Sequence, residues 1–216
     1  MQDDFNAWWA VGSAITLPLV RLLFRVRREG IGHVPAAGPG ILAFNHVSVL
    51  DGPALAIETA RGRRRTVRFV VASEVFDHWF YGRILRSFDQ ISIRRGEGDG
   101  GALGTAIRTV RAGALAAIAP EGRVGEHPEA GLQRMRSGCA RIALQTGAPV
   151  IPVGMWGTQR RWPWSGPVWT KLWRRPSLAI VFGPPIHSHH DDDYESFGRR
   201  IGEAIEEQVR RARAIA

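Results

Sequence analysis

Short apolar runs alternate with stretches of helical spacing along most of the chain. The apolar runs predict strands near residues 31–34, 40–45, 66–72, 89–95, 113–120, 147–155 and 177–183. Apolar residues at intervals of three or four predict helices over residues 102–113, 132–147 and 199–216. The first two of these helices end at a glycine, Gly113 and Gly147, as helices often do. Strands that alternate with helices indicate an α/β fold, with a mixed, largely parallel sheet flanked by helices.

The N-terminal stretch from Phe5 to Val20 contains no charged residue. It is shorter than the roughly 20 apolar residues that span a bilayer, and Arg21 ends it. It is also not typical of a secretory signal, because Asp3 and Asp4 occupy the end where such signals are basic. We therefore expect neither a membrane-spanning helix nor a signal peptide here.

Two interpretations of this stretch remain open, a helix packed on the core and a helix lying in the membrane interface. Trp8 and Trp9 favour the interface, where their rings sit at the level of the lipid headgroups. Anionic lipid would then meet the basic residues that follow, which are Arg21, Arg25, Arg27 and Arg28. The chain is accordingly divided into an N-terminal amphipathic, membrane-associating helix over residues 1–28 and a main domain over residues 29–216.

Composition narrows the class of protein and of partner. A chain of 216 residues with 44% hydrophobic content is long enough to bury one full core. Its formal net charge of +9 predicts anionic partners such as nucleic acid, an anionic membrane surface or a phosphorylated substrate. Lys171 is the only lysine, and arginine suits phosphate because its planar fork can bond two oxygens at once. The single cysteine, Cys139, excludes an intramolecular disulfide and fits a reducing compartment.

The segment FNHVSVLDGPAL places His46 and Asp51 five positions apart. That spacing points two side chains in different directions in a strand or a helix, so these two can meet only across a turn. An apolar strand ends near His46, and the sequence Asp-Gly-Pro at 51–53 favours a helix start. Asp51 could then fix the tautomer of the imidazole, whose other nitrogen would take a proton from a hydroxyl. Alternatively, Asp51 only caps the helix and His46 is a partly buried ring.

Other strands also end in polar residues. Glu121, Gly122 and Arg123 follow an apolar strand and could clamp a phosphorylated headgroup, although a surface ion pair in a turn would give the same pattern. Arg94 and Arg95 end another strand, where they could equally be solvated. Ligands of α/β sheets bind beyond the carboxyl ends of strands, so these residues are candidates for one site.

Taken together, these motifs resemble a known family. The order Asn-His-x-x-x-x-Asp (Asn45, His46 and Asp51), a strand that ends in Arg95, Pro-Glu-Gly at 120–122, and GAPVIPVG with Pro152 is similar to the four blocks of the glycerolipid acyltransferase superfamily, which includes the lysophosphatidic-acid acyltransferases. The resemblance covers about residues 30–160. It implies an O-acyltransferase that moves a fatty acyl group from a thioester to the free hydroxyl of a lysophospholipid in phospholipid synthesis. The expected acceptor is 1-acylglycerol 3-phosphate, which would give phosphatidic acid.

The resemblance also implies roles for individual residues. His46 would be the general base, oriented by Asp51, and Cys139 a structural residue. The implied substrate-binding residues are Asn45, Arg95, Glu121, Gly122, Arg123 and Pro152. No metal and no cofactor are implied, since acyl-CoA or acyl carrier protein serves as the donor substrate. The expected partners are the phospholipid bilayer and the lysophospholipid, and the expected location is peripheral, on the cytoplasmic face of the cell membrane.

This sequence departs from the family pattern at several positions. In the second block, Asp89 and Arg94 occupy the usual glycine and acidic positions. In the third block, Ala119 replaces the usual phenylalanine, and Thr-Arg after the glycine becomes Arg123-Val124, which moves the arginine one place earlier. Two alternatives therefore stay open, the same chemistry on another lysophospholipid or glycolipid, and a non-catalytic basic module that binds lipid or nucleic acid.

Three further segments could carry function. Residues 156–175 interleave tryptophans with basic residues, which favours a second membrane or acyl-chain contact; single-stranded nucleic acid and core packing are the alternatives, and we expect no nucleic-acid partner. Residues 61–68, RGRRRTVR, predict a solvated loop. Residues 187–193, HSHHDDD, predict a helix-capping loop, because their histidines and aspartates lack the spacing of a metal site.

Overall fold

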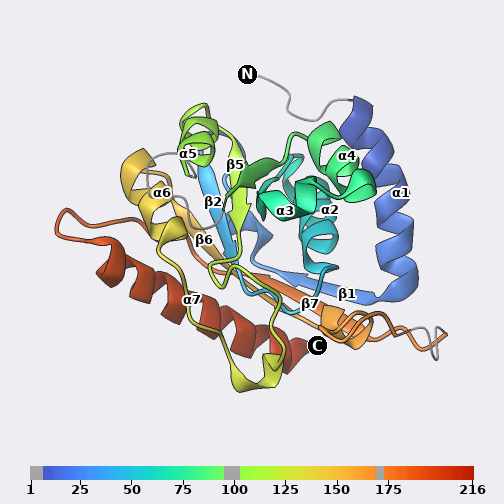
Figure 1. The fold of residues 1–216 in the computed structure, drawn as a ribbon. Helices are drawn as coiled ribbons and strands as arrows, with labels where there is room; N and C mark the ends of the chain where they lie inside the picture. Colours follow the sequence, from blue (N-terminus) through green and yellow to red (C-terminus); the bar gives the residue numbers. More distant parts are fainter. Residues whose placement is uncertain (1–6, 95–102, 169–172) are drawn as a thin grey trace.

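The computed structural model describes residues 7–94, 103–168 and 173–216. Its centre is a seven-stranded sheet (Figure 1), and the strand order is β1-β7-β6-β2-β5-β3-β4. Neighbouring strands pair in parallel, except that β6 and β7 are antiparallel. The prediction of a mixed, largely parallel α/β sheet is therefore confirmed. The strands are β1 Arg25–Glu29, β2 Gly40–Phe44, β3 Arg68–Ala72, β4 Ile91–Ile93, β5 Leu115–Ile118, β6 Val150–Trp156 and β7 Ser177–Phe182.

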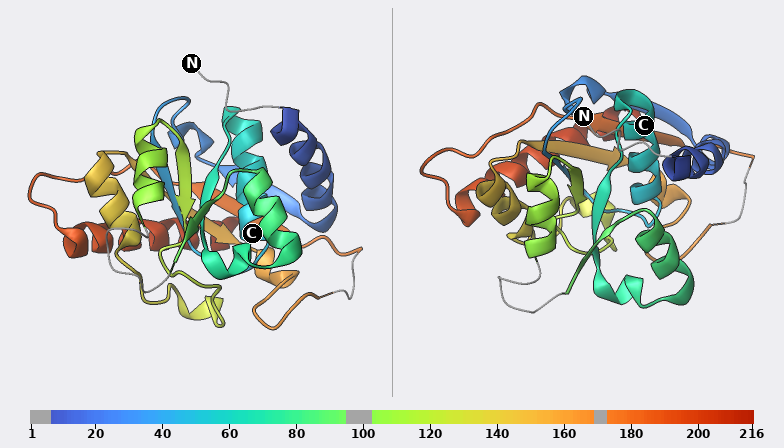
Figure 2. Two further views of the ribbon diagram at one scale, coloured as in Figure 1. Left: turned by 45° about the horizontal axis from the view of Figure 1, so that its top comes forward. Right: turned by 90° about the horizontal axis from the view of Figure 1, so that it is seen from above.

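Helices cover both faces of this sheet. α5, α6 and α7 pack on one face, and α1 and α2 pack on the other (Figures 1 and 2). The helices are α1 Ala7–Leu23, α2 Asp51–Arg63, α3 Ser73–Phe76, α4 Trp79–Ser87, α5 Gly104–Arg111, α6 Gly138–Thr146 and α7 Tyr194–Ile215. Three short 3-10 turns, η1 Ile31–His33, η2 Pro128–Ala130 and η3 Thr158–Arg160, lie in the connections.

Strand β2 shows why the sequence signal for the central strands was strong. Ile41 and Ala43 belong to the core beneath α5, α6 and α7, whereas Leu42 and Phe44 belong to the core beneath α1 and α2. Successive side chains alternate between the two faces, and both faces are covered, so every residue of the strand is buried. This central strand carries His46 just beyond its carboxyl end.

Two predicted elements were wrong at the N-terminal side. The short strand expected near residues 31–34 is the 3-10 turn η1, because Gly30 adopts φ 68° and turns the chain. The predicted helix over residues 1–28 is too long, since α1 ends at Leu23 and residues 25–29 pair with β7 as an edge strand. That strand has the sequence RVRRE, and its charged residues conceal the apolar alternation by which strands are recognised.

Helix α1 has two different faces. Val20, and Phe24 just after the end of the helix, are buried against the sheet. Arg21 forms a 2.6 Å ion pair with the buried carboxylate of Glu58 on α2. The opposite face exposes a stripe of apolar side chains, which are Trp8, Val11, Ile15, Leu19 and Leu22. Within residues 7–94, 103–168 and 173–216, no helix combines the length and the hydropathy needed to cross a bilayer.

Candidate active site

The turn between β2 and α2 brings the histidine and the aspartate together. His46 lies just after β2 and Asp51 begins α2, and their Nδ1 and Oδ2 atoms are 2.9 Å apart. The Asp51 side chain is fully buried, whereas the His46 ring remains 24% exposed. The two residues thus meet across a turn, the one geometry that their spacing allows.

The Asp51 carboxylate is held by four donors. Its Oδ2 accepts hydrogen bonds from the His46 ring and from the backbone N–H groups of Val47 and Ser48, both at 2.8 Å. Its Oδ1 accepts a 2.5 Å bond from the hydroxyl of Thr158, in the turn after β6. The alternative of a simple helix cap is not what the structure has, because the α2 cap residue is Leu50 and makes no side-chain capping bond. Asp51 instead organises the whole turn.

This network fixes the orientation of the imidazole. An aspartate that accepts from Nδ1 selects the tautomer with its proton on Nδ1, which leaves the Nε2 lone pair able to accept a proton. The ring also makes an edge-on contact with Phe44, with 5.8 Å between ring centroids. The pair has the arrangement of a general base and the group that orients it.

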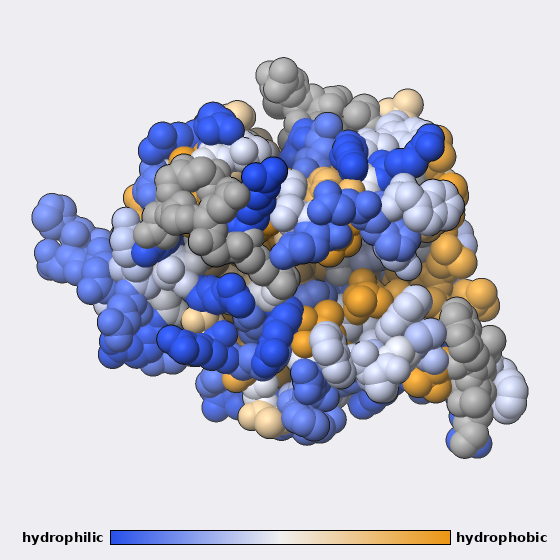
Figure 3. All heavy atoms as spheres, in the orientation of Figure 1, coloured by the Kyte–Doolittle hydropathy of each residue, from blue (hydrophilic) through white to orange (hydrophobic). Residues whose placement is uncertain are grey.

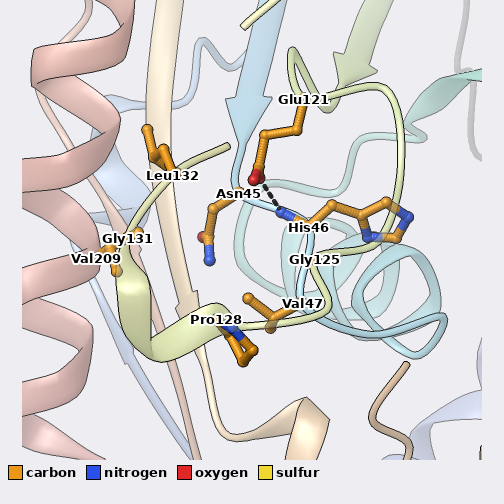
Figure 4. Close-up of a pocket in the computed structure, with 9 residues that line it drawn as sticks. All are labelled: Asn45, His46, Val47, Glu121, Gly125, Pro128, Gly131, Leu132 and Val209. Atoms are coloured by element: carbon orange, nitrogen blue, oxygen red, sulfur yellow. Dashed lines mark hydrogen bonds between the residues drawn. The ribbon is translucent and has the colours of Figure 1, made fainter. Parts of the chain in front are cut away.

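Glu121 holds the neighbouring loop against His46. Because β2 and β5 are parallel neighbours, their carboxyl ends lie side by side. One Glu121 oxygen accepts a 2.7 Å bond from the backbone N–H of His46 (Figure 4). The other oxygen accepts from the backbone N–H of Gln133 at 3.0 Å. Burial raises the pKa of this carboxyl above its ordinary value, while the hydrogen bonds from Gln133 and His46 oppose the shift. Both oxygens accept from protein donors, so Glu121 braces the turn that carries His46.

Asn45 and Pro152, two predicted substrate-binding residues, belong to the framework. The Asn45 amide accepts from the backbone N–H of Met155 at 2.7 Å and donates to the Met155 carbonyl at 3.0 Å, which joins the end of β2 to β6. Pro152 is buried in β6, where its ring approaches Gly183. Neither residue lines the large cavity described below.

A small and a large cavity adjoin His46. The smaller one, about 10 Å³, lies beside Asn45 and Leu132 and has room for one water molecule at most. The His46 ring is turned away from these two residues in Figure 4. The larger cavity, about 800 Å³, is within the range of ligand pockets in proteins, and His46 also lines it. Only this second cavity can hold a substrate.

The large cavity has an apolar wall and a group of arginines. Its apolar wall comes from α1, α4 and the strands, and includes Trp9, Phe69, Ile84, Leu85 and Phe88. Its charged residues among those described are all arginines, namely Arg94, Arg123, Arg136 and Arg141, and no described acidic side chain lines it. Gly122 also lines it, whereas Arg95 lies outside the described residues.

Cys139 also lies on the wall of the large cavity. It is buried on α6, and burial raises the pKa of its thiol to about 12. The thiolate is the nucleophilic form of cysteine, so at neutral pH this side chain is an inert, protonated core residue. This fits the structural role that we expected for it.

The remaining sequence motifs have mixed outcomes. The predicted solvated loop at 61–68 is wrong in part, because Arg65 is buried and donates to the carbonyls of Pro35 and Gly113. In residues 156–175, Trp156 packs in the core beneath Arg213, whereas Trp164 lies exposed at the cavity wall. Residues 169–172 of that segment lie outside the described residues.

The segment 187–193 has the predicted capping role. Asp193 accepts from the backbone N–H groups of Glu195 and Ser196 at the start of α7. Asp192 accepts from Arg200 and from the backbone N–H of His189. In the described ranges, no group of three or more histidine, cysteine or acidic side chains is arranged to hold a metal ion.

Four residues of the site were missed from the sequence. Thr158 follows a strand, which is a weak signal for a site residue. The other three, Gln133, Arg136 and Arg141, come from the loop before α6 and from α6 itself, and only the folded chain brings them to the cavity and to Glu121.

The fold and this site define a class, a doubly covered α/β sheet with a histidine–aspartate pair at the end of its central strand. A family model described as Acyltransferase matches residues 25–156, more than half of the chain. The chain therefore belongs to the acyltransferase family, and the acyltransferase assignment expected from the sequence motifs is confirmed.

Individual proteins agree with this assignment. Uncharacterized protein ML2427 of Mycobacterium leprae and uncharacterized protein Rv0502 of Mycobacterium tuberculosis are both 31% identical over 196 residues, which is 85% of this chain. The match covers 49% and 51% of those proteins, so the chain spans about half the length of the curated relatives it matches. The crystal structure of PlsC from Thermotoga maritima, described as a 1-acyl-sn-glycerophosphate acyltransferase, has a TM-score of 0.76 and 21% identity. That match covers 95% of this chain and 79% of PlsC, and it shows the shared fold.

Proposed function

We propose that the protein transfers a fatty acyl group from a thioester to the free hydroxyl of a lysophospholipid, with 1-acylglycerol 3-phosphate as the first candidate acceptor. The observation that carries this proposal is the large cavity, where the His46 ring shares one space with an apolar wall and four arginines. An apolar wall suits acyl chains, and guanidinium groups suit phosphate. PlsC of Thermotoga maritima, which shares the fold, is described as acting on the same class of acceptor.

The proposed reaction is a direct transfer. Nε2 of His46 takes the proton of the acceptor hydroxyl while the hydroxyl oxygen attacks the thioester carbonyl. The new C–O ester bond forms, the C–S bond breaks, and the thiolate of coenzyme A or of acyl carrier protein leaves and takes up a proton. Asp51 stabilises the imidazolium that forms during the attack, as the acceptor of its Nδ1 hydrogen bond. The reaction as proposed uses the thioester as a substrate and needs no cofactor.

An acyl-transfer assay with mass-resolved products tests this function. Purified protein is given palmitoyl- or oleoyl-coenzyme A, or the acyl carrier protein thioester, with a panel of lysophospholipids and glycolipids. Phosphatidic acid formed from 1-acylglycerol 3-phosphate, and absent with His46→Ala, is the expected result. Product from another acceptor would keep the mechanism and replace the substrate. A folded protein that binds anionic vesicles but turns over no donor and acceptor pair would be a lipid-binding module.

We further propose that the protein works at the cytoplasmic face of the cell membrane as a peripheral protein. The exposed stripe on α1 supports this, and apolar side chains gather along the right-hand side of Figure 3, where α1 lies. Helix α4 adds exposed aromatic residues, Trp79, Phe80 and Tyr81, and its residues Ile84 and Leu85 line the cavity. The two helices that carry exposed apolar side chains thus also contribute to the wall of the cavity.

Substitutions on the exposed stripe test the membrane proposal without unfolding the helix. Deletion of residues 1–28 would also remove β1 and the ion pair to Glu58, so it would test folding more than membrane binding. Ile15→Gln with Leu19→Gln changes exposed side chains alone. We expect this variant to lose co-sedimentation with anionic vesicles while its melting temperature is unchanged. Retained co-sedimentation would contradict the role of α1.

A further inference from the structure

Arg136 and Gly122 lie in direct contact at the cavity wall. Gly122 has φ 70°, and a Cβ atom placed on it would come 3.0 Å from Nε of Arg136 and 3.1 Å from Cδ. The Arg136 side chain therefore crosses directly over the backbone of the Pro-Glu-Gly turn. A hydrogen bond of 2.9 Å from the backbone N–H of Arg136 to the Pro120 carbonyl fixes this crossing. Glycine is needed at position 122 both for its positive φ and for this close approach.

The two arginines beside this turn differ in their partners. Nε of Arg123 donates to Oε1 of Gln133 at 2.7 Å, and Gln133 in turn binds Glu121. Arg123 is thus braced by the loop that supports His46. The Arg136 guanidinium, by contrast, makes no hydrogen bond or ion pair with residues 7–94, 103–168 or 173–216. It is exposed, it lines the cavity, and its five N–H donors remain available.

We propose that Arg136 binds the phosphate of the acceptor and takes the place of the arginine that the family pattern carries at the position of Val124. This inference rests on the proposed function. A phosphate monoester presents several oxygens, and a planar guanidinium bonds two of them at once, whereas a lysine would provide one point of charge. In this sequence the arginine of the third block, Arg123, stands one residue early. The fold supplies a second guanidinium from Arg136, twelve residues after Val124.

Steady-state kinetics with matched variants tests this assignment. Arg136→Gln removes the guanidinium, and Arg134→Gln is the control, because Arg134 is exposed two residues earlier and does not line the cavity. We expect Arg136→Gln to raise the KM for 1-acylglycerol 3-phosphate by about 10- to 100-fold, the range that the loss of a charge-assisted hydrogen bond gives. The kcat and the KM for the donor should stay unchanged. The acceptor KM of Arg136→Lys should lie between those of the wild type and Arg136→Gln. A KM for the acceptor equal to that of Arg134→Gln, or a rise in the donor KM alone, would overturn the proposal.

A binding measurement separates this proposal from the proposed reaction. Titration of glycerol 3-phosphate into His46→Ala protein is followed by calorimetry, with glycerol as the uncharged comparison. Binding that is lost with Arg136→Gln and kept with Arg134→Gln supports the phosphate site, even if no acyl transfer is found with any substrate pair. If acyl transfer is present and glycerol 3-phosphate binds equally to both variants, the phosphate site fails and the proposed function stands.

Discussion

Two histidine–aspartate pairs in the described part of the chain have the same residue types but differ in burial and in surroundings. His46 and Asp51 are 2.9 Å apart, with the aspartate fully buried and the histidine 24% exposed. His190 and Asp191 are 3.2 Å apart, and both side chains are about fully exposed, at 102% and 99%. The first pair lies beyond the carboxyl end of a central strand, and the second lies in the loop before α7.

The comparison shows what turns two common residues into a candidate catalytic pair. Burial alone would penalise the Asp51 charge, but three protein donors besides His46 stabilise it. Water surrounds the exposed pair, so its attraction is weak and its geometry is not fixed. The first pair differs from the second in the donors that surround Asp51 and in the cavity that His46 lines. Substitutions can alter the donors and the cavity separately.

The largest effect should come from Asp51→Asn. The amide would point an N–H group at one of the donors that now surround the carboxylate, and Nδ1 of His46 would lose its charged acceptor. We expect kcat to fall on the order of 10²- to 10⁴-fold, the typical contribution of general base catalysis. Asp191→Asn is the matched control and should leave kcat unchanged in the same acyl-transfer assay. Equal activities of the two variants would remove the distinction between the pairs.

Glu121→Gln should have the next largest effect. A glutamine keeps one acceptor but presents an N–H₂ group to the donors of His46 or Gln133, so the turn that carries His46 loosens. We expect kcat to fall about tenfold, which corresponds to about 1.4 kcal/mol, while the KM for the acceptor stays unchanged. A selective rise in that KM would show instead that Glu121 binds the substrate, as its place in the family motif implied.

The same variant should change the pH dependence of stability. Burial raises the pKa of Glu121 in the folded state above its ordinary value of 4.5. Between the ordinary pKa and the raised pKa, the folded protein holds a proton that the unfolded chain has lost. The free energy of unfolding therefore decreases as pH rises through this window, and Glu121→Gln should lack that slope. Chemical denaturation of both proteins at a series of pH values measures the difference. Parallel pH profiles would contradict the assignment.

Thr158→Val probes one donor of the buried pair with little change in volume. The loss of its hydroxyl leaves Oδ1 of Asp51 without a partner and should lower the free energy of unfolding by about 1.5–3 kcal/mol. We expect kcat to fall by a few-fold, because the other three donors still hold Asp51. Thr59 is the matched control, since it is also buried but its hydroxyl has no hydrogen-bond partner. Thr59→Val should therefore unfold at the wild-type denaturant concentration or above it.

The smallest effect should come from Asp193→Ala, in the loop of the exposed pair. Hydrogen bonds from the backbone and the side chain of Ser196 hold the pKa of Asp193 below 3.8, so its stabilisation is present at neutral pH and is lost as pH falls through the lowered value. The melting temperature should drop slightly at pH 7 and not at all in strong acid, with kcat unchanged. A change in kcat would link this loop to the active site.

The sequence was informative where local pattern and final structure agree. The apolar runs of β2, β5 and β6 predicted their strands, because both faces of these strands are buried and their hydrophobicity is continuous. The spacing of His46 and Asp51, together with a strand end and a helix start, predicted that they meet in a turn. Charged β1 was missed for the opposite reason, since it lies at the edge of the sheet and RVRRE has no apolar run.

By itself, then, the sequence determined the fold class, the family and the contact between His46 and Asp51, because each depends on residues close together in the chain or on motifs in a fixed order. Only the tertiary structure decided that Glu121 braces the turn, that Asn45 joins two strands, and that Arg136 crosses Gly122 at the cavity. Those contacts join segments that are distant in the sequence, and parallel strands bring them together at one edge of the sheet.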